Sequence, residues 1–208
     1  MSRRLKPLTL EAVRATAPGC GSCVFWESDA RVEVRCGAAC DDALLRARIS
    51  EIRHGWGEFG RAAVDDDLVL GFVKCAPVSF FPQTRWLPTG APEPSVPLLA
   101  CLHVREETRS RGLEKVLLHA VMRDLHARGE RELFAYGVSG GTHVAPPMPD
   151  LKFLLEQGFV IERPHAQYPL LKLEVKSLAA WTESLESALG FLLPPLSRPQ
   201  RVPAPSAE

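Results

Sequence analysis

Apolar and polar residues follow two different rhythms along this chain. Apolar residues recur three and four positions apart over residues 41–56 and 113–128, a spacing that gives a helix one apolar face. Between these segments lie short, continuous apolar runs of strand length, bounded by turn residues. The alternation of the two patterns along the chain predicts an α/β fold, in which helices cover a sheet.

Turn residues between the apolar runs fix the order of the expected strands. An acidic tripeptide separates residues 61–64 from residues 68–75, which predicts a hairpin. A segment of helix length separates residues 98–104 from residues 133–137, which predicts a right-handed crossover between two parallel strands. The sheet should therefore mix parallel and antiparallel pairs. The other expected strands cover residues 23–26, 159–163 and 170–176.

Capping residues mark the ends of the expected helices. Asp41 or Asp42 is a suitable N-cap for the first helix, and Gly55 is a suitable stop. Gly129 follows the second helix at the position where a left-handed residue commonly ends a helix. Asp150 and Gly158 bracket a shorter helix in the same way. The expected helices cover residues 41–56, 113–128, 150–157 and 178–193.

Prolines delimit the segments that should lack regular structure. They predict an irregular start over residues 1–18 and a disordered tail over residues 194–208. Six prolines between residues 77 and 97 predict a long surface loop. The aromatic residues of this loop could form one wall of a binding cleft, or they could pack on the domain. We therefore expect a single domain over residues 19–193.

Composition narrows the classes of function. The chain has 208 residues, of which 46% are apolar, and this is typical of a folded soluble domain. Its formal net charge is zero, which argues against binding to nucleic acid, because phosphate neutralisation needs a surplus of Lys and Arg. No apolar run reaches membrane-spanning length, and the first residues lack the apolar core of a signal peptide. We expect a cytoplasmic protein whose six cysteines are reduced.

The turn after the central strand carries the strongest functional signal. It contains Arg109, Ser110, Arg111 and Gly112, and a helix begins directly after it. The first N–H groups of a helix have no intrahelical partner and carry partial positive charge, so they suit a phosphate. The two arginines add charged, forked donors. The alternative is an ordinary strand–helix connection with solvated arginines.

At these residues the chain resembles the GNAT family of N-acetyltransferases. The signature of that family is Arg or Gln, two residues, Gly, one residue, and then Gly or Ala. Arg109 and Gly112 match this signature, and Glu114 stands where the family has Gly or Ala. Residues 153–159 resemble the family's late helix, which ends in Gly-Phe. The resemblance covers about residues 20–176, and the Cys-x-x-Cys-Val-Phe-Trp-Glu opening resembles one bacterial branch.

The resemblance implies a GNAT-like mixed central sheet with helices on both faces, and acetyl-CoA as co-substrate. In that fold two parallel strands splay apart and hold the cofactor. The central strand would then pair with the pantetheine arm, and the turn would wrap the pyrophosphate. Glu114 adds negative charge there, and we expect its side chain to turn outward while its N–H still donates. The expected cofactor-binding residues are Leu102, His103, Val104, Arg109, Ser110, Arg111, Gly112, Leu113 and Glu114.

Acetyl transfer to an amine needs a neutral amine, a donor for the oxyanion and a proton for the leaving thiolate. Many GNAT enzymes place a base early on the central strand and a tyrosine in the late helix. Here residues 98–100 contain no base, and Leu154 stands at the tyrosine position. Two substitutes are Tyr168, just before the last strand, and His103, which strand alternation places on the face opposite its neighbours. Each could instead be a structural residue.

Four cysteines have the spacing Cys20-x2-Cys23-x12-Cys36-x3-Cys40, which resembles that of a four-cysteine zinc site. Against zinc, no glycine-rich knuckle follows the first pair, and cysteine is a common small core residue. A redox pair would need a thioredoxin-like context that is missing here. We therefore assign no metal ligand from the sequence, and we expect the two other cysteines in the core.

We expect an N-acetyltransferase that moves an acetyl group from acetyl-CoA to an amine, on a small molecule or on a protein lysine or N-terminus. Two alternatives stay open. One is a non-catalytic, acyl-CoA-binding GNAT fold that acts as a sensor or scaffold. The other is a zinc-bearing interaction module built on residues 20–40. The amphipathic helix over residues 178–193 could pack on its own sheet or on a second copy in a homodimer.

Overall fold

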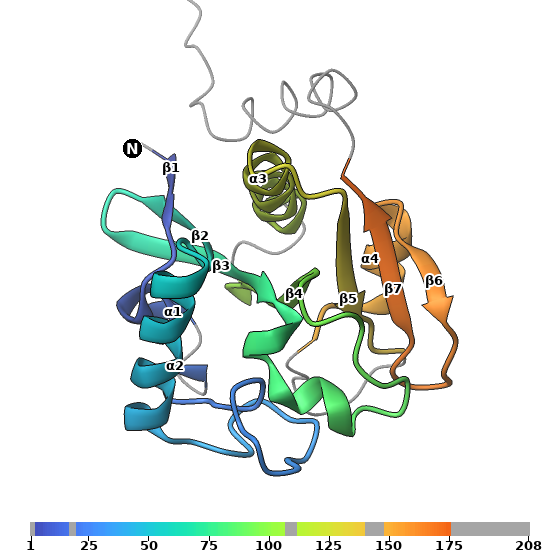
Figure 1. Cartoon of the computed structure of the whole chain (residues 1–208). Coiled ribbons are helices and arrows are strands. Elements are labelled where there is room, and N and C mark those ends of the chain that lie inside the picture. Colours follow the sequence, from blue (N-terminus) through green and yellow to red (C-terminus); the bar gives the residue numbers. More distant parts are fainter. Residues whose placement is uncertain (1–2, 17–19, 107–111, 140–147, 176–208) are drawn as a thin grey trace, which may run out of the picture.

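A mixed sheet with helices on both faces forms the protein (Figure 1). The computed structural model describes residues 3–16, 20–106, 112–139 and 148–175. The strands are β1 (Arg3–Pro7), β2 (Gly60–Asp65), β3 (Leu68–Pro77), β4 (Pro97–Val104), β5 (Glu132–Tyr136), β6 (Val160–Arg163) and β7 (Leu170–Glu174). The helices are α1 (Leu10–Thr16), α2 (Asp42–Gly55), α3 (Leu113–Ala127) and α4 (Leu151–Glu156), with two short 3-10 helices, η2 (Val78–Phe80) and η3 (Pro82–Trp86).

The order of the strands in the seven-stranded sheet is β1-β2-β3-β4-β5-β7-β6. β4 and β5 pair in parallel, because α3 carries the chain back along the sheet between them, and the other neighbours are antiparallel. The expected mixed sheet is confirmed. None of the described helices is long and apolar enough to cross a membrane.

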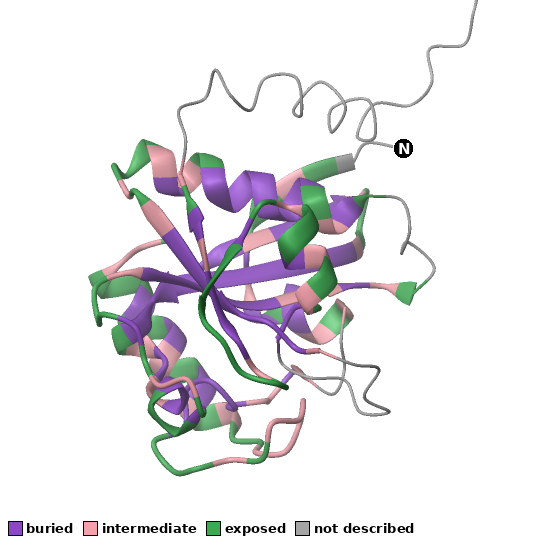
Figure 2. Cartoon of the chain, turned by 90° about the vertical axis from the view of Figure 1, so that its right-hand side faces the viewer, coloured by how far each residue is buried: buried purple, intermediate pink, exposed green. Residues whose placement is uncertain are grey.

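Buried residues form one core on each face of the sheet, and Figure 2 shows most of the central strands in the colour of buried residues. On one face, which we call the α1/α2 face, Ile52 of α2 belongs to the same core as Phe72 of β3. On the other, the α3/α4 face, Leu117 and Leu154 join Leu99 of β4. The predicted cover of helices on both faces is therefore confirmed.

Most of the expected elements lie within two residues of the observed bounds. The caps are those predicted: Asp41 Oδ1 accepts a hydrogen bond from Leu44 N at 2.9 Å, and Asp150 Oδ1 accepts one from Phe153 N at 3.0 Å. The expected helix over residues 178–193 and the tail lie outside the described residues.

The start of the chain differs from the irregular segment expected over residues 1–18. β1 pairs antiparallel with β2, and α1 buries Leu10 and Val13 in the core of the α1/α2 face. Pro7 is compatible with this pairing because it is the last residue of an edge strand, where its missing N–H costs no ladder bond on the free side.

Residues 23–26 do not form the expected strand. Cys23 makes only an isolated bridge with Cys40, and turns follow it. Phe25 and Trp26 are nevertheless almost completely buried. The apolar residues of this run indicate burial but not an extended backbone. Over four residues, periodicity alone cannot distinguish a buried turn from a buried strand.

The proline-rich connection between β3 and β4 packs on the α1/α2 face. Its Phe81 is fully buried, and its ring centroid lies 6.0 Å from that of Trp26. Trp86 is 45% exposed, but its Nε1 donates a hydrogen bond to Asp29 O at 3.2 Å. These aromatic residues therefore serve mainly to hold the connection and the segment before α2 together.

A buried glutamine fixes the segment between α1 and α2, whose described residues 20–41 we call the cysteine loop. Gln83 of η3 accepts a hydrogen bond from Val32 N at 3.0 Å. Its amide group donates to Ala30 O at 2.7 Å and to Ser28 O at 3.1 Å. Hydrogen bonds to η3 thus hold the cysteine loop in place, although its described residues 21–41 form no helix or strand.

Gln83→Ala should destabilise the domain by about 2 kcal/mol, because it leaves one N–H and two carbonyl groups of the cysteine loop without their partner. Denaturant unfolding followed by tryptophan fluorescence would measure the loss. Arg85→Ala is the matched control, because this neighbour in η3 makes an exposed ion pair with Asp29 and should matter little. Equal losses in the two variants would contradict the special role of Gln83.

Candidate functional site

β4 has a free edge toward β5 over most of its length. The two strands pair only through Leu98 with Phe134 and through Leu99 with Ala135. β4 continues to Val104, whereas β5 ends at Tyr136 and pairs on its other side with β7. Within the described chain, residues 100–104 therefore meet no strand on this side, and we call their edge the β4 notch. An extended ligand can hydrogen-bond to such an edge as an added strand would.

A β-bulge in β4 sets which side chains border the notch. Lys74 of β3 is paired with Cys101, and the next residue, Cys75, with Leu99, so Ala100 is an extra residue on β4. Ala100 and Cys101 consequently both belong to the core of the α1/α2 face.

After the bulge the normal alternation of side chains resumes. Leu102 and Val104 pack with the core of the α3/α4 face. The His103 ring instead contacts Phe72 of the other core, with 5.1 Å between the ring centroids. The expectation that His103 points away from its neighbours is thus confirmed.

The first turn of α3 has the features of an anion site. Gly112 stands before it with a left-handed backbone (φ 74°), and a Cβ at this position would meet nothing within 4 Å. Leu113 is fully buried and anchors the helix start in the core. Glu114 is half-buried in this first turn, where a carboxylate opposes a bound phosphate. Arg109, Ser110 and Arg111 lie outside the described residues.

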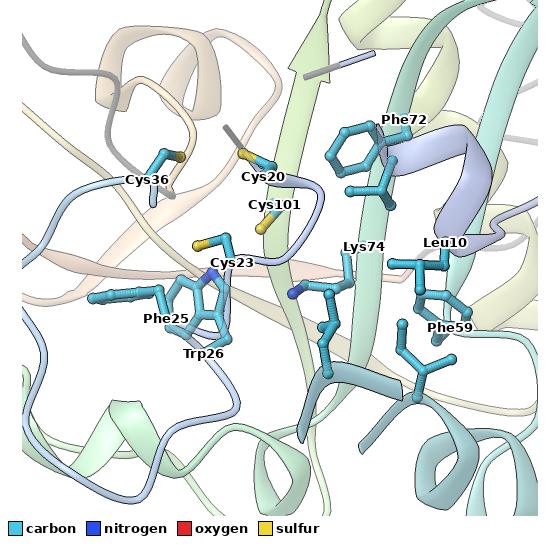
Figure 3. A pocket seen from close by; sticks show the side chains of 13 residues that line it. Leu10, Cys20, Cys23, Phe25, Trp26, Cys36, Phe59, Phe72, Lys74 and Cys101 are labelled. Carbon is cyan, nitrogen blue, oxygen red and sulfur yellow. The ribbon is translucent and has the colours of Figure 1, made fainter. Parts of the chain in front are cut away.

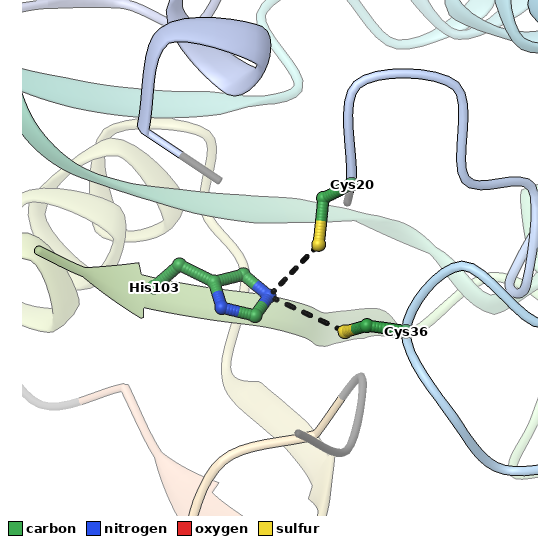
Figure 4. Close-up of side chains that lie close together, drawn as sticks. All are labelled: Cys20, Cys36 and His103. Atoms are coloured by element: carbon green, nitrogen blue, oxygen red, sulfur yellow. Dashed lines mark hydrogen bonds between the residues drawn. The ribbon is translucent and has the colours of Figure 1, made fainter. Parts of the chain in front are cut away.

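Two cysteines and a histidine meet beside the notch (Figure 4). His103 Nε2 lies 3.7 Å from Cys20 Sγ and 3.9 Å from Cys36 Sγ. A hydrogen bond from Cys36, and a further one with His103, lower the pKa of Cys20 to about 4. The same contact with Cys20, together with burial, raises the pKa of Cys36. Cys20 is therefore the more readily ionised thiol of the two.

The two other cysteines of the loop have separate partners. Cys23 Sγ accepts a hydrogen bond from Gly37 N at 3.4 Å. Cys40 is exposed, and its thiol donates to Gly37 O at 3.6 Å. The four-cysteine grouping suggested by the spacing is thus not the one that the fold assembles. Cys75 and Cys101 are buried in the core as expected, and burial raises the pKa of Cys101 to about 12.

Lys74, one partner of a buried ion pair, lines a small cavity under the cysteine loop (Figure 3). Lys74 Nζ donates to Glu27 Oε1 at 2.6 Å, and the Glu27 side chain is fully buried. Desolvation alone would lower the pKa of Lys74, but Cys101 and the Glu27 carboxylate outweigh it and raise this pKa. The cavity has a volume of about 20 Å³, enough for one water molecule. The pair is therefore a structural element, not a group that a substrate can reach.

Tyr168 lies on the connection between β6 and β7, where it packs against the core of the α1/α2 face. Its ring stacks on that of His165, with 6.2 Å between the centroids and 7° between the planes. Among the described residues no hydrogen bond or ring contact joins Tyr168 to His103. The structure thus places the two predicted catalytic residues on the same face of the sheet without bringing them into contact.

Several solved protein structures resemble this fold, although no protein-family model matches the sequence and no curated protein is detectably similar to it. An N-acetyltransferase from Staphylococcus aureus Mu50 aligns at 13% identity over 85% of this chain and 100% of its own, with a TM-score of 0.55. The protein yncA from Salmonella typhimurium, solved with its cofactor acetyl-CoA, aligns at 12% identity over 85% and 96%, with a TM-score of 0.56. The PaiA N-acetyltransferase from Thermoplasma acidophilum, solved with coenzyme A, aligns at 13% identity over 84% and 99%, with a TM-score of 0.51. The chain has the GNAT fold.

Within the GNAT fold the predicted cofactor-binding residues fall into two groups. Leu102, His103 and Val104 are the residues of the β4 notch, and Gly112, Leu113 and Glu114 form the start of α3. Leu154, at the position where many GNAT enzymes have a tyrosine, is fully buried in the core.

Sequence reasoning missed the contact of His103 with Cys20 and Cys36. The sequence shows both the cysteine spacing and the histidine, but Cys36 and His103 lie 67 positions apart along the chain. Only the packing of the cysteine loop on β4 brings them together. A signal lay in the polar histidine of an otherwise apolar strand, which needs a polar partner when it faces a core.

Glu27→Gln should destabilise the domain by about 3 kcal/mol or more, because it leaves the buried Lys74 ammonium without its counter-charge. The double variant Glu27→Gln/Lys74→Met should recover most of this loss, since it removes both charges. Denaturant unfolding measures both effects. Glu132→Gln serves as the control, because the ion pair of Glu132 with Lys172 lies at the surface. A double variant no more stable than Glu27→Gln would contradict the explanation.

Proposed function

We propose that this protein is an N-acetyltransferase that uses acetyl-CoA and acts on a primary amine. The observation that carries the proposal is the pairing of β4 with β5 through only two residue pairs, which leaves the β4 notch open for an extended ligand. Two of the three solved structures named above contain coenzyme A or acetyl-CoA, and they support the same assignment of the fold.

The chain offers separate surfaces for the two chemically different parts of acetyl-CoA. The amide groups of a pantetheine arm would pair with the backbone of residues 100–104, as a strand pairs with an edge. The pyrophosphate would meet the N–H groups of Gly112, Leu113 and Glu114 at the start of α3. Arg109 and Arg111, from the sequence of the preceding turn, would add ionic contacts. Acetyl-CoA supplies the activated acetyl group as a thioester.

The residues of the α1/α2 face would bind the amine and take part in proton transfer. Backbone N–H groups near Val104 are the available donors for the carbonyl oxygen of the acetyl group. His103 Nε2 is already close to two sulfur atoms, so it is a poor base for an incoming amine. We assign the proton donor for the leaving thiolate to Tyr168, which lies on this face and carries the phenol that the late helix lacks. The remaining rate acceleration would come from holding an already neutral amine close to the thioester in the right orientation.

A second candidate is a GNAT fold that binds acyl-CoA without turnover. Three observations favour it: residues 98–100 are buried and apolar, Leu154 is buried, and Glu114 places a carboxylate at the phosphate site. Binding without release of free thiol in the presence of an amine panel would support this candidate.

The arginine pair of the turn should decide the affinity for acetyl-CoA. We expect the double variant Arg109→Ala/Arg111→Ala to lower the affinity at least tenfold, because it removes charge-assisted contacts to the pyrophosphate. Isothermal titration calorimetry with acetyl-CoA measures the loss. Arg123→Ala, an exposed arginine on α3 away from its first turn, is the control and should bind as the wild type does. Unchanged affinity in the double variant would contradict the assignment of the pyrophosphate site.

Glu114→Gln should bind acetyl-CoA about twofold to fivefold more tightly, because it removes a negative charge from the first turn of α3 while keeping the size of the side chain. Glu130→Gln changes the net charge equally but lies beyond the other end of α3, about 22 Å away along the helix. It should leave the affinity as it is. The same titration compares the two, and weaker binding by Glu114→Gln would show that this carboxylate supports the site instead of opposing it.

A further inference from the structure

We propose that Cys20, Cys36 and His103 bind a single zinc ion. The three residues come from the start of the cysteine loop, its second half and the β4 notch, and Figure 4 shows their side chains converging. Their ligand atoms, two Sγ and one Nε2, all lie within 4.8 Å of one another. This proposal does not depend on the proposed acetyl transfer.

The two sulfur–nitrogen distances are close to those that a tetrahedral ion requires. Typical Zn–S and Zn–N bonds at the tetrahedral angle place sulfur about 3.6 Å from nitrogen and about 3.8 Å from a second sulfur. The observed separations of His103 Nε2 are 3.7 Å from Cys20 Sγ and 3.9 Å from Cys36 Sγ. An ion can therefore be placed among the three atoms with only small side-chain adjustments.

Hydrogen bonding alone accounts less well for the same arrangement. A neutral imidazole nitrogen offers one lone pair or one proton, so Nε2 of His103 can form one good hydrogen bond, yet two sulfur atoms stand at similar distances from it. An ion is bound by all three atoms at once. Phe72 packs against the imidazole and holds its plane, which keeps Nε2 directed toward the sulfur atoms.

The chemistry of the donor set selects the metal. Two thiolates and an imidazole are soft to intermediate ligands, which suit Zn²⁺ and not Mg²⁺ or Ca²⁺, because those ions require oxygen. Two thiolates also neutralise the charge of Zn²⁺, which suits a half-buried position. The nearby Lys74 and Glu27 already neutralise each other and add no net charge.

The fourth coordination position belongs to a water molecule. Among the described residues, no further His, Cys, Asp or Glu places a ligand atom in this group. Cys23 and Cys40 instead contact the backbone of Gly37. Three protein ligands and one exchangeable position would give a site that ties the cysteine loop to β4 and that leaves His103 unable to act as a base.

The test is the metal content of the purified full-length chain, measured by plasma mass spectrometry after expression with added zinc. Wild type should contain about one zinc per chain. The variants Cys20→Ser, Cys36→Ser and His103→Gln should each lose most of it. Cys40→Ser, the same substitution at the exposed cysteine of the same loop, should retain it. Retention in the first three variants, or equal loss in Cys40→Ser, would overturn the ligand assignment.

Cobalt(II) uptake keeps the proposal testable if a variant fails to fold. Reduced, metal-free wild type, titrated with cobalt(II) under anaerobic conditions, should develop thiolate-to-cobalt charge transfer and the intense visible bands of four-coordinate cobalt. Chelation of the zinc should also lower the melting temperature by several degrees, since the ion binds only the folded chain. Wild type that contains no zinc and takes up no cobalt overturns the proposal, as does a Cys20–Cys36 disulfide in its place. Acetyl-CoA binding, titrated separately, can succeed or fail without changing this result.

Discussion

β4 hydrogen-bonds to β3 along nearly its whole length but to β5 through only two residue pairs. A strand in the middle of a sheet normally satisfies its backbone groups on both sides, so residues 100–104 leave one side of their ladder incomplete. The bulge at Ala100 belongs to the same stretch, and it decides that His103 faces α1 and α2 while Leu102 and Val104 face α3. The notch thus comes from the short pairing of β4 with β5, and the direction of its side chains from the bulge opposite β3.

The two faces of the sheet are covered by different elements near this interruption. α3 covers one face, and Gly112 precedes its first turn, where we propose that the pyrophosphate binds. On the other face the cysteine loop packs beside α1 and α2. It depends on the Gln83 bonds, on the packing of Trp26 against Phe81 and on the buried pair of Lys74 and Glu27. These contacts hold the loop closely enough for Cys20 and Cys36 to reach His103 on β4.

The departures from the GNAT pattern all concern charge and proton transfer, not the architecture. The buried Leu154 and the apolar residues 98–100 contribute to the cores instead of to chemistry. Glu114 introduces charge where the helix start would otherwise be purely electropositive. Under the proposed function, the chain keeps the shape of an acyl-CoA site, but the groups that activate the amine differ from those of many GNAT enzymes. In that proposal Tyr168, which packs on the α1/α2 face, supplies the proton for the leaving thiolate.

The sequence by itself determined the regular elements and their caps. Local spacing fixed α2, α3, α4 and the strands β2 to β7, because hydrophobic periodicity and capping act over a few residues. It also marked the residues at the β4 notch and at the start of α3. Only the tertiary structure decided the rest. β1 forms because it can pair with the edge of β2, and α1 forms because it can pack on the α1/α2 face. Residues 23–26 form turns because their side chains can be buried without the backbone pairing as a strand. The meeting of Cys20, Cys36 and His103 depends on contacts across more than sixty positions of the chain, which no local pattern encodes.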